Sequence, residues 1–573
     1  MLFPDLHDRI AYRIERSVEF KRNPAHYFDL IWRPCTVKIL MVADSFLYFS
    51  DEDFGLSDLI GIVKNENLSY VRFDISVAHR GSPTDARMGV GNPNITNRIK
   101  NFTFDSSFTA AGYDQVWLFA AERSRDPDHN GTWTDRLTDS ELRVLMEFMD
   151  AGGGVFATGD HEDLGAAMGG FLPRVRQMRR WFFPEPGPNG EGLAPPFEGP
   201  GRFDTNRLGH DPGYQFNDQS DDIPQVIEPK LYSKHSPLII GKYTFPHPVL
   251  CGPAGPIEVL PDHPHESQCT TAATPDATED LNGKTFTEFK PAVDGGLRPL
   301  PEVIATSRVL GGHTTSGKTG TTLAREFGAI SVYDGHRAGV GRIVADATWH
   351  HFINVNLTGD STASGDKLIG FLASASGLDV YSQIKAYFLN IAQWIAPTPK
   401  ISCMRNWGLL FAVWNHRLAE VFDPAVRMKT ATVVDLVLIG RHARDAIDKF
   451  AGQCQSFEWT LDLVWAEIQL PYIDLGDPWR VPERIEQFEG RPKDPEAGDL
   501  LRLDWVGDAA VGGAILALRE KIDPLDQESL DAFSEEGEEI VRHGAGQAVQ
   551  LAVSFVQDSL AEIAKTTRSA KQK

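Results

Sequence analysis

The amino-acid sequence predicts an α/β protein with a mostly parallel sheet and a long insertion, followed by a mainly α-helical C-terminal domain. Short apolar runs at 37–44 (VKILMVAD) and 155–160 (VFATGD) are typical of buried parallel strands. A helical pattern lies between strand candidates, and alternation of helices with strands indicates βαβ units. After residue 400 the apolar spacing becomes helical.

Further elements of the α/β region follow from local patterns. Strands are expected at 70–77 and 113–120. Thr138 followed by Glu141 forms a capping box that predicts the start of a helix, and the glycines at 152–154 predict its end. The next strand candidate is VFATGD at 155–160.

Residues 171–300 interrupt this alternation. They are rich in proline and glycine and show no sustained period, so we expect a long insertion with a few short strands. Strand patterns return at 302–306, 328–334 and 341–346, and a helix at 381–395 is expected to close the domain.

The predicted domains are an N-terminal helical extension (1–35), the α/β domain (36–400) and a helical domain (401–573). Residues 407–470 and 500–565 carry helical apolar spacing, and a linker rich in proline and charge separates them at 471–499. Four tryptophans of the helical domain are expected in its core: Trp407, Trp414, Trp459 and Trp465. Gly544 and Gly546 argue against one continuous final helix.

Composition and charge limit the classes of function and the cellular location that fit this sequence. The net charge of -23 excludes a general nucleic-acid binder, and the arginine run at 174–180 is interpreted as a solvated helix face. The N-terminus has no apolar signal region, and no apolar run spans a membrane. Five widely spaced cysteines favour unpaired thiols in a reducing compartment. A cytoplasmic location without membrane contact is therefore expected.

Three segments resemble the ThuA-like branch of the class I glutamine amidotransferase-like superfamily. They are AGGGVFATGDHEDLG (151–165), FPHPVLCG (245–252) with the following GPIEVLPDHPHES (255–267), and AGVGRIVADATWHHF (338–352). The resemblance covers about residues 36–397 and implies a flavodoxin-like sheet. It also implies a sharp elbow at Gly159–Asp160, where amidotransferases carry a cysteine. No cysteine lies between Cys35 and Cys251, so a cysteine glutaminase is excluded.

The candidate site lies where the predicted parallel strands end. Ligands of open parallel sheets bind beyond the carboxyl ends of the strands. The residues expected at those ends are Asp44, Asp160, His161, Asp163, Asp346, His350 and His351, with the loop of Asp262, His263, His265 and Glu266 folding over them. Asp160, His161 and His350 are the candidate catalytic residues. Asp44, Ser45, Asp262, Glu266 and Trp349 are the candidate substrate-binding residues.

Two kinds of chemistry remain open at this site. Histidine and carboxylate side chains together suit Zn, Mn or Fe, and a metal-bound water would replace the missing thiol. The candidate metal ligands are Asp160, His161, Asp163, His263, His265 and His351. Alternatively, Asp160, His161 and His350 act as a metal-free acid/base site.

The function expected from the sequence is a hydrolase-like or lyase-like enzyme on a ThuA-like scaffold, acting on a small polar molecule. The alternative is a non-catalytic ligand-sensing or assembly module of a bacterial regulatory or defence complex. Its helical C-terminal domain would then self-associate or bind a protein partner. A weaker alternative is nucleotide binding at 312–319 (GHTTSGKT), which matches GxxxxGK[ST] but leaves little room for the helix that should follow.

Overall fold

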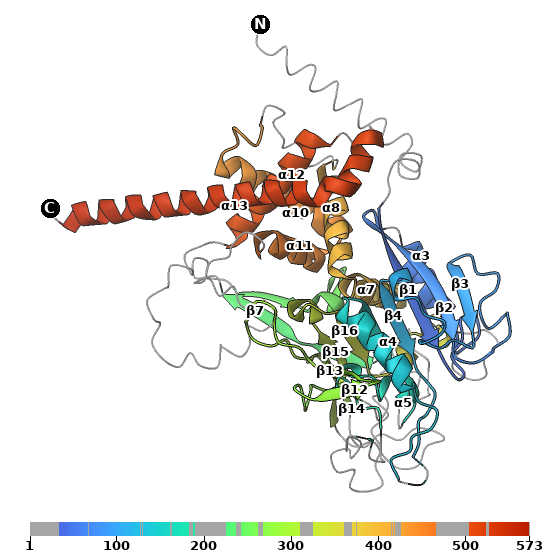
Figure 1. Ribbon diagram of the computed structural model, residues 1–573. Coiled ribbons are helices and arrows are strands. Elements are labelled where there is room, and N and C mark those ends of the chain that lie inside the picture. The colour runs from blue at the N-terminus through green and yellow to red at the C-terminus, as the bar shows by residue number, and fades with distance from the viewer. Residues whose placement is uncertain are drawn as a thin grey trace.

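The structure is a computed structural model in which the α/β region and the helical region pack against each other (Figure 1). It describes residues 34–66, 68–126, 128, 130–160, 163–182, 187–188, 225–235, 242–261, 268–309, 325–359, 370–373, 375–413, 415, 418, 426–465, 503–522 and 527–571. Residues 1–33 of the extension expected at 1–35, the linker at 471–499 and Trp414 lie outside these residues, and Cys35 already belongs to β1.

A ten-stranded sheet forms the centre of the α/β region. Six neighbouring strands are parallel: β3 (Ile95–Lys100), β2 (Val71–His79), β1 (Cys35–Ala43), β4 (Gln115–Phe119), β5 (Gly154–Thr158) and β16 (Ile343–Asp346). Four antiparallel strands continue the sheet beyond β16: β15 (Arg325–Tyr333), β14 (Glu302–Val309), β6 (Gln225–Pro229) and β11 (Val259–Leu260). From β1 the chain proceeds outward to β2 and β3, and then from β4 outward to β16. The topological switch point therefore lies between β1 and β4.

The parallel strands are buried on both faces, which explains their continuous apolar runs. Ile39 and Met41 of β1 pack into one core with α3 (Ser57–Asn65) and α7 (Ala375–Trp394). Leu40 and Val42 pack into the other core with α4 (Asp139–Asp150). The strands expected at 37–44, 70–77, 113–120 and 155–160 are confirmed as β1, β2, β4 and β5.

Helix α4 begins as its sequence predicts. The Thr138 side chain accepts from the backbone N–H of Glu141, and the Glu141 carboxylate accepts from the N–H of Thr138, which completes the capping box. Glu141 is also buried against Arg80, with 2.6 Å between carboxylate and guanidinium. This pair ties the start of α4 to the end of β2.

The strands predicted at 302–306, 328–334 and 341–346 are confirmed as β14, β15 and β16. Their sequence patterns do not specify a direction, and β14 and β15 pair antiparallel in the mostly parallel sheet. Strand β3 was not expected, because its sequence ITNRIK is mostly polar and has no apolar run. Its backbone pairs with β2 although its side chains give no buried pattern.

The described parts of the insertion contain short strands, as expected. They are β6 and β11 of the main sheet and three two-stranded pairs: β7 (Leu231–His235) with β8 (Lys242–Pro246), β9 (Cys251–Gly252) with β10 (Gly255–Pro256), and β12 (Thr278–Leu281) with β13 (Lys284–Thr287). Two short helices lie near the carboxyl edge of the sheet, α5 (Ala166–Gly169) and α6 (Asn354–Leu357).

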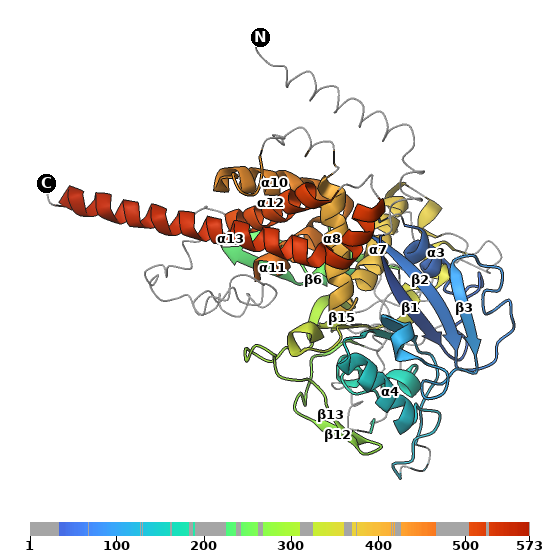
Figure 2. The same cartoon turned by 45° about the horizontal axis from the view of Figure 1, so that its top comes forward.

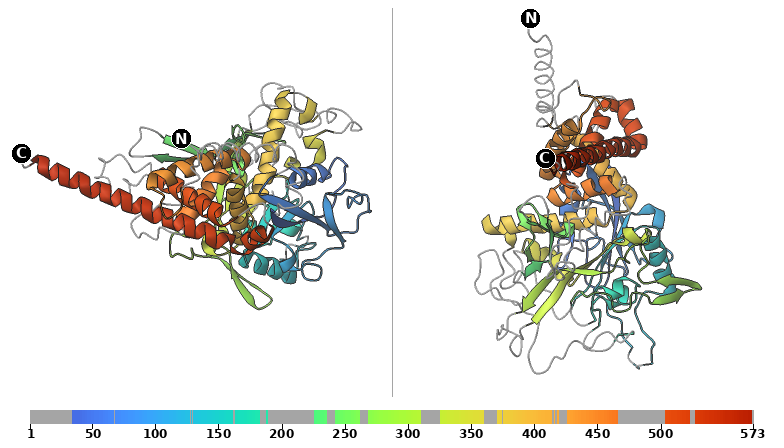
Figure 3. Two further views of the ribbon diagram at one scale, coloured as in Figure 1. Left: turned by 90° about the horizontal axis from the view of Figure 1, so that it is seen from above. Right: turned by 90° about the vertical axis from the view of Figure 1, so that its left-hand side faces the viewer.

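The helical region is built from α8 (Thr398–Val413), α10 (Val433–Phe450), α11 (Gln453–Trp465), α12 (Leu503–Lys521) and α13 (Gln527–Lys571) (Figure 2). The domain boundary expected at residue 400 falls inside α8. Trp407 and Trp459 are buried, as expected of core residues. Helix α13 runs without a break through Gly544 and Gly546, against expectation, and extends beyond the other helices (Figure 3).

The described cysteines differ in whether they form a disulfide bond. Cys35, Cys269 and Cys403 are free thiols, whereas Cys251 is disulfide-bonded, which corrects the expectation that all five are unpaired. Within the described chain, no helix combines the length and the apolar character needed to cross a membrane.

Candidate functional site

The site forms at the carboxyl ends of β5 and β16, which are parallel neighbours with Thr158 opposite Asp346. Asp160 follows β5 after one glycine. Beyond β16 the chain turns through Thr348 into a short 3-10 turn, Trp349–His351. The backbone N–H of Trp349 donates to the carbonyl oxygen of Gly159 at 2.9 Å. The two strand ends are thus held together beyond the last strand residues.

Asp160 and His350 lie side by side. The His350 Nε2 atom is 3.3 Å from Asp160 Oδ2, and Thr348 Oγ1 donates to Asp160 Oδ1 at 2.9 Å. The Asp160 carboxylate is fully buried, whereas 9% of the His350 side chain is exposed. The imidazole therefore stands between the buried carboxylate and the outside of the protein.

Several contacts hold the His350 ring and backbone in place. Trp349 stacks on the ring with 4.1 Å between centroids and 17° between planes. Thr348 Oγ1 accepts from the His350 N–H at 3.1 Å, and Asn356 Nδ2 donates to the His350 carbonyl at 3.0 Å. Asn356 Nδ2 also lies 3.4 Å from His350 Nδ1. Nε2 of His350 is thus directed at Asp160, and Nδ1 faces the Asn356 amide.

The second histidine, His351, belongs to a different network. Its Nδ1 lies 2.7 Å from Asp346 Oδ1, and the Tyr387 hydroxyl donates to Asp346 Oδ2 at 2.6 Å. Burial and the neighbouring Asp346 carboxylate raise the pKa of Tyr387 well above its ordinary value. All three side chains are buried, so this network anchors the end of β16 to α7.

Arg179 joins the two strand ends from within the core. Its guanidinium donates to the Asp160 carbonyl at 2.7 Å and to the Ala347 carbonyl at 2.7 and 3.0 Å. Burial lowers the pKa of Arg179 to about 10. The interpretation of 174–180 as a solvated helix face is wrong, because Arg174 and Arg179 are both buried. The sequence gives no signal for this role, since the carbonyls that Arg179 binds come from distant segments.

Asp44 directly follows β1, at the topological switch point of the sheet. Its Oδ1 atom accepts from the backbone N–H groups of Ala121 at 2.6 Å and Glu122 at 2.9 Å. Among the residues that the structure describes, no donor reaches its buried Oδ2 atom. Burial raises the pKa of Asp44 to about 7, against the lowering effect of the two N–H groups. The next residue, Ser45, adopts the left-handed region with φ of 53°.

Aromatic contacts connect the end of β1 with the histidine. Phe46 meets Trp349 edge to face with 5.5 Å between centroids, and Trp349 stacks on His350. The predicted substrate-binding residues Asp44, Ser45 and Trp349 are therefore grouped around the same edge as Asp160 and His350.

Other candidate residues are not brought together there. Asp163 pairs with Arg123 at 2.6 Å and Arg125 at 3.6 Å, and His351 faces Asp346. His161, Asp262, His263, His265 and Glu266 lie outside the described residues. In the part of the chain that is described, no group of three His, Cys, Asp or Glu side chains is arranged to hold a metal.

The segment 312–319, with Lys318, also lies outside the described residues. The strands on either side of it, β14 and β15, pair with each other in antiparallel fashion. A P-loop instead joins a strand to a helix. The flanking elements therefore disfavour nucleotide binding there.

Together, the fold and the site define an α/β protein with a mostly parallel central sheet and a carboxylate–imidazole pair at its carboxyl edge. No protein-family model matches the chain, and the curated proteins contain no match to it.

Proposed function

We propose that this protein is a hydrolase-like or lyase-like enzyme that acts on a small polar substrate through acid–base chemistry at Asp160 and His350. The observation that carries the proposal is the buried Asp160 carboxylate 3.3 Å from the more accessible His350 imidazole. A buried carboxylate that binds one ring nitrogen orients an imidazole and stabilises its protonated form, which makes the other nitrogen an effective base.

The roles follow from these positions. Asp160 orients His350, and Thr348 holds the second oxygen of Asp160. His350 Nδ1 removes a proton from water or from the substrate once either replaces the Asn356 amide as its hydrogen-bond partner. Asp44 is a second group able to exchange a proton near neutral pH, since burial raises its pKa to about 7. A base and an acid of this kind suffice to hydrolyse a sugar derivative, an amide or a nucleotide fragment, or to eliminate a leaving group from it.

The resemblance to ThuA-like proteins remains part of this proposal. When the edge strand β3 is set aside, the parallel strands have the order β2-β1-β4-β5-β16. This order matches the 2-1-3-4-5 order of flavodoxin-like sheets. Asp160 follows β5 where amidotransferases carry their cysteine. The order and this position support a flavodoxin-like, class I amidotransferase-like scaffold.

A divalent metal does not fit the described residues. Both oxygens of Asp160 are engaged by Thr348 and His350, Asp163 is paired with Arg123, and His351 with Asp346. We therefore assign no step to Zn, Mn or Fe. Ligation by His161, His263 and His265 remains a prediction from the sequence.

The proposal is tested by incubating purified protein with pools of sugar derivatives, amides and nucleotides and following their conversion by mass spectrometry. We expect conversion of at least one class. His350→Gln and Asp160→Asn should each lower turnover by about 100-fold or more, because general acid–base groups contribute 10²–10⁴-fold. His543→Gln changes an exposed histidine on α13 and is the matched control.

Circular dichroism and melting temperature must show that the variants are folded. Full turnover in folded His350→Gln would overturn the proposed role of the pair. A folded wild-type protein that converts nothing would favour the alternative of a non-catalytic ligand-sensing or assembly module.

A further inference from the structure

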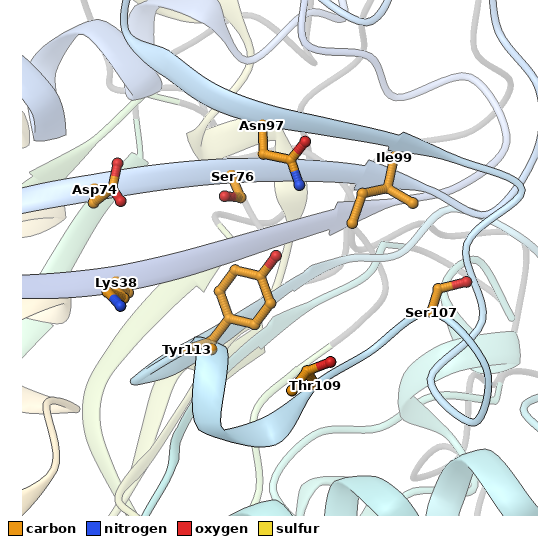
Figure 4. A pocket seen from close by; sticks show the side chains of 9 residues that line it. Lys38, Asp74, Ser76, Asn97, Ile99, Ser107, Thr109 and Tyr113 are labelled. Carbon is orange, nitrogen blue, oxygen red and sulfur yellow. The ribbon is translucent and has the colours of Figure 1, made fainter.

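A second polar site lies on the sheet, away from the Asp160–His350 pair. It is a pocket of about 350 Å³ on the face of β1, β2 and β3, closed on one side by the connection from β3 to β4 (Figure 4). Small-molecule sites typically have volumes of about 300–1,000 Å³. The pocket is therefore large enough for a small ligand.

The pocket is open because, among the elements that the structure describes, neither connection on this side of β1–β3 forms an α-helix. The connections 80–94 and 101–114 are fully described and contain no α-helix, only the 3-10 turn Ala110–Gly112. Parallel strands are normally covered by crossover helices on both faces. Here the strands β1–β3 instead present polar side chains to the open face.

Strand geometry brings these side chains together. Asp74 and Ser76 are two residues apart on β2 and share one face. Lys38 of β1 is the register partner of Asp74, and Asn97 of β3 is the partner of Ser76. The register of β3 shifts between Ile75 and Ser76 of β2, as in a β-bulge. Such irregularities re-aim side chains and are common next to binding sites.

Several polar atoms of the pocket have no protein partner within the described chain. Ser76 is 7% exposed as a residue, and its hydroxyl lines the pocket without being among the buried, unpartnered polar atoms of the described chain, so solvent reaches it. The Lys38 ammonium and the Tyr113 hydroxyl have no hydrogen-bond partner there either, and Figure 4 shows the Tyr113 hydroxyl directed toward β2 and β3. Groups that are open to water in this way can exchange their bound water for the hydroxyls of a ligand.

The connection from β3 to β4 supplies the opposite wall. Ser107 and Thr109 line it with two further hydroxyls. The Tyr113 ring stacks on Phe108 with 5.8 Å between centroids and 9° between planes. Phe108 in turn meets Phe148 of α4 edge to face, so the tyrosine ring is supported by the core.

We propose that this pocket binds a neutral, hydroxyl-rich molecule of monosaccharide size. The lining carries one ammonium, that of Lys38, and one carboxylate, that of Asp74. The Asp74 carboxylate also accepts from Thr96 and lies 4.0 Å from Lys64. The lining residues therefore have no net formal charge, and the rest of the polar lining consists of hydroxyls and one amide. Its hydroxyls and the Asn97 amide both donate and accept hydrogen bonds, as the hydroxyls of a sugar do. Tyr113 adds an aromatic surface for the apolar face of a sugar ring. This proposal does not depend on the proposed enzymatic activity.

The test uses saturation-transfer difference NMR of the full-length protein with D-glucose, D-galactose and D-mannose at millimolar concentration, and with gluconate and glucosamine as charged probes, followed by titration calorimetry. We expect at least one sugar to bind with a Kd of about 1 mM, equivalent to about 4 kcal/mol. Tyr113→Ala and Asp74→Asn should each weaken binding about tenfold, because each removes a contact worth about 1–2 kcal/mol. Asp105→Asn alters an exposed carboxylate of the same connection and should bind as wild type.

Tyr113→Phe keeps the ring and removes only the hydroxyl, so it guards against misfolding as the cause of any loss. We expect an intermediate affinity for it. The proposal is overturned if no sugar binds to folded protein, if only gluconate or glucosamine binds, or if sugar binding is abolished by Asp160→Asn and unchanged in Tyr113→Ala and Asp74→Asn.

Discussion

At the scale of single residues, consecutive histidines of the site have different partners. His350 faces Asp160 and keeps 9% of its side chain exposed, while His351 faces Asp346 and is fully buried. Both histidines follow β16, and from the sequence both are predicted to lie in the candidate site. Their separation results from the 3-10 turn Trp349–His351, which directs neighbouring side chains to different sides.

Asp44 should make stability depend on pH. Its folded-state pKa of about 7 lies above the ordinary value of 3.8. Between these values the folded protein keeps a proton that the unfolded chain releases. The free energy of unfolding therefore falls as pH rises from about 4 to 7, by an amount on the order of 4 kcal/mol.

We predict that Asp44→Asn removes this component of the pH dependence, so that the variant gains stability relative to wild type above about pH 7. The amide oxygen can still accept from the N–H groups of Ala121 and Glu122. Urea unfolding across this pH range measures the effect, and Asp51→Asn, at an exposed carboxylate in the following loop, should retain the wild-type profile. Parallel profiles for Asp44→Asn and wild type would show that Asp44 ionises normally.

At the scale of elements, glycines set how closely the C-terminal helices pack. A Cβ atom on Gly440 of α10 would collide with the carbonyl oxygen of Asp508 on α12, and one on Gly512 would collide with that of Leu436. Gly513 and Gly544 make the same kind of close approach between α12 and α13. Gly544 therefore serves helix packing rather than interruption of α13.

We predict that Gly440→Ala destabilises the protein by about 2 kcal/mol or more, because backbone atoms cannot move aside without separating the helices. Gly61→Ala in α3 is the matched control, since its Cβ would meet nothing nearer than the Asn94 side chain at 3.9 Å. That variant should be neutral or more stable by about 0.5–1 kcal/mol. Chemical denaturation measures the free energy of unfolding of both variants. Equal values for Gly440→Ala and Gly61→Ala would contradict the close contact between α10 and α12.

At the scale of the whole molecule, the two regions share one hydrophobic core. The same cluster of buried residues contains β1, α3 and α7 as well as the packed faces of α8 and α10–α13. Trp459 of α11 meets Tyr70, next to β2, edge to face at 5.0 Å. Arg342, next to β16, pairs with Glu458 of α11 at 2.8 Å, with both side chains largely buried.

We predict that the protein unfolds in a single calorimetric transition, because these contacts couple the regions. Trp459→Ala should lower the midpoint temperature of that single transition, since truncation of a buried tryptophan costs about 3–5 kcal/mol of stability. Phe555→Ala, at an exposed position of α13, should leave it unchanged. Two separate transitions, with only one shifted by Trp459→Ala, would indicate independently folding domains.

The parts of the fold that were predicted correctly depend on local patterns. The apolar runs of β1 and β5 and the capping box of α4 are short-range signals, because burial on both faces and helix capping act within a few residues. The position of β3 could not be predicted, because it is held by backbone pairing to β2 and has little apolar pattern of its own. The direction of β14 and β15 could not be predicted either: these consecutive strands pair antiparallel with each other, and β15 with β16, and the apolar pattern of a single strand does not specify its direction.

The sequence by itself determined the alternation of strands and helices and the positions of Asp44, Asp160 and His350 at strand ends. Only the tertiary structure decided which of these side chains meet, that Arg179 lies beneath them, and that a polar pocket opens over β1–β3. The physical reason is that strand ends and helix caps are set by neighbouring residues. Side-chain contacts and the burial of charge instead depend on which strands become neighbours and on which faces the connecting segments cover.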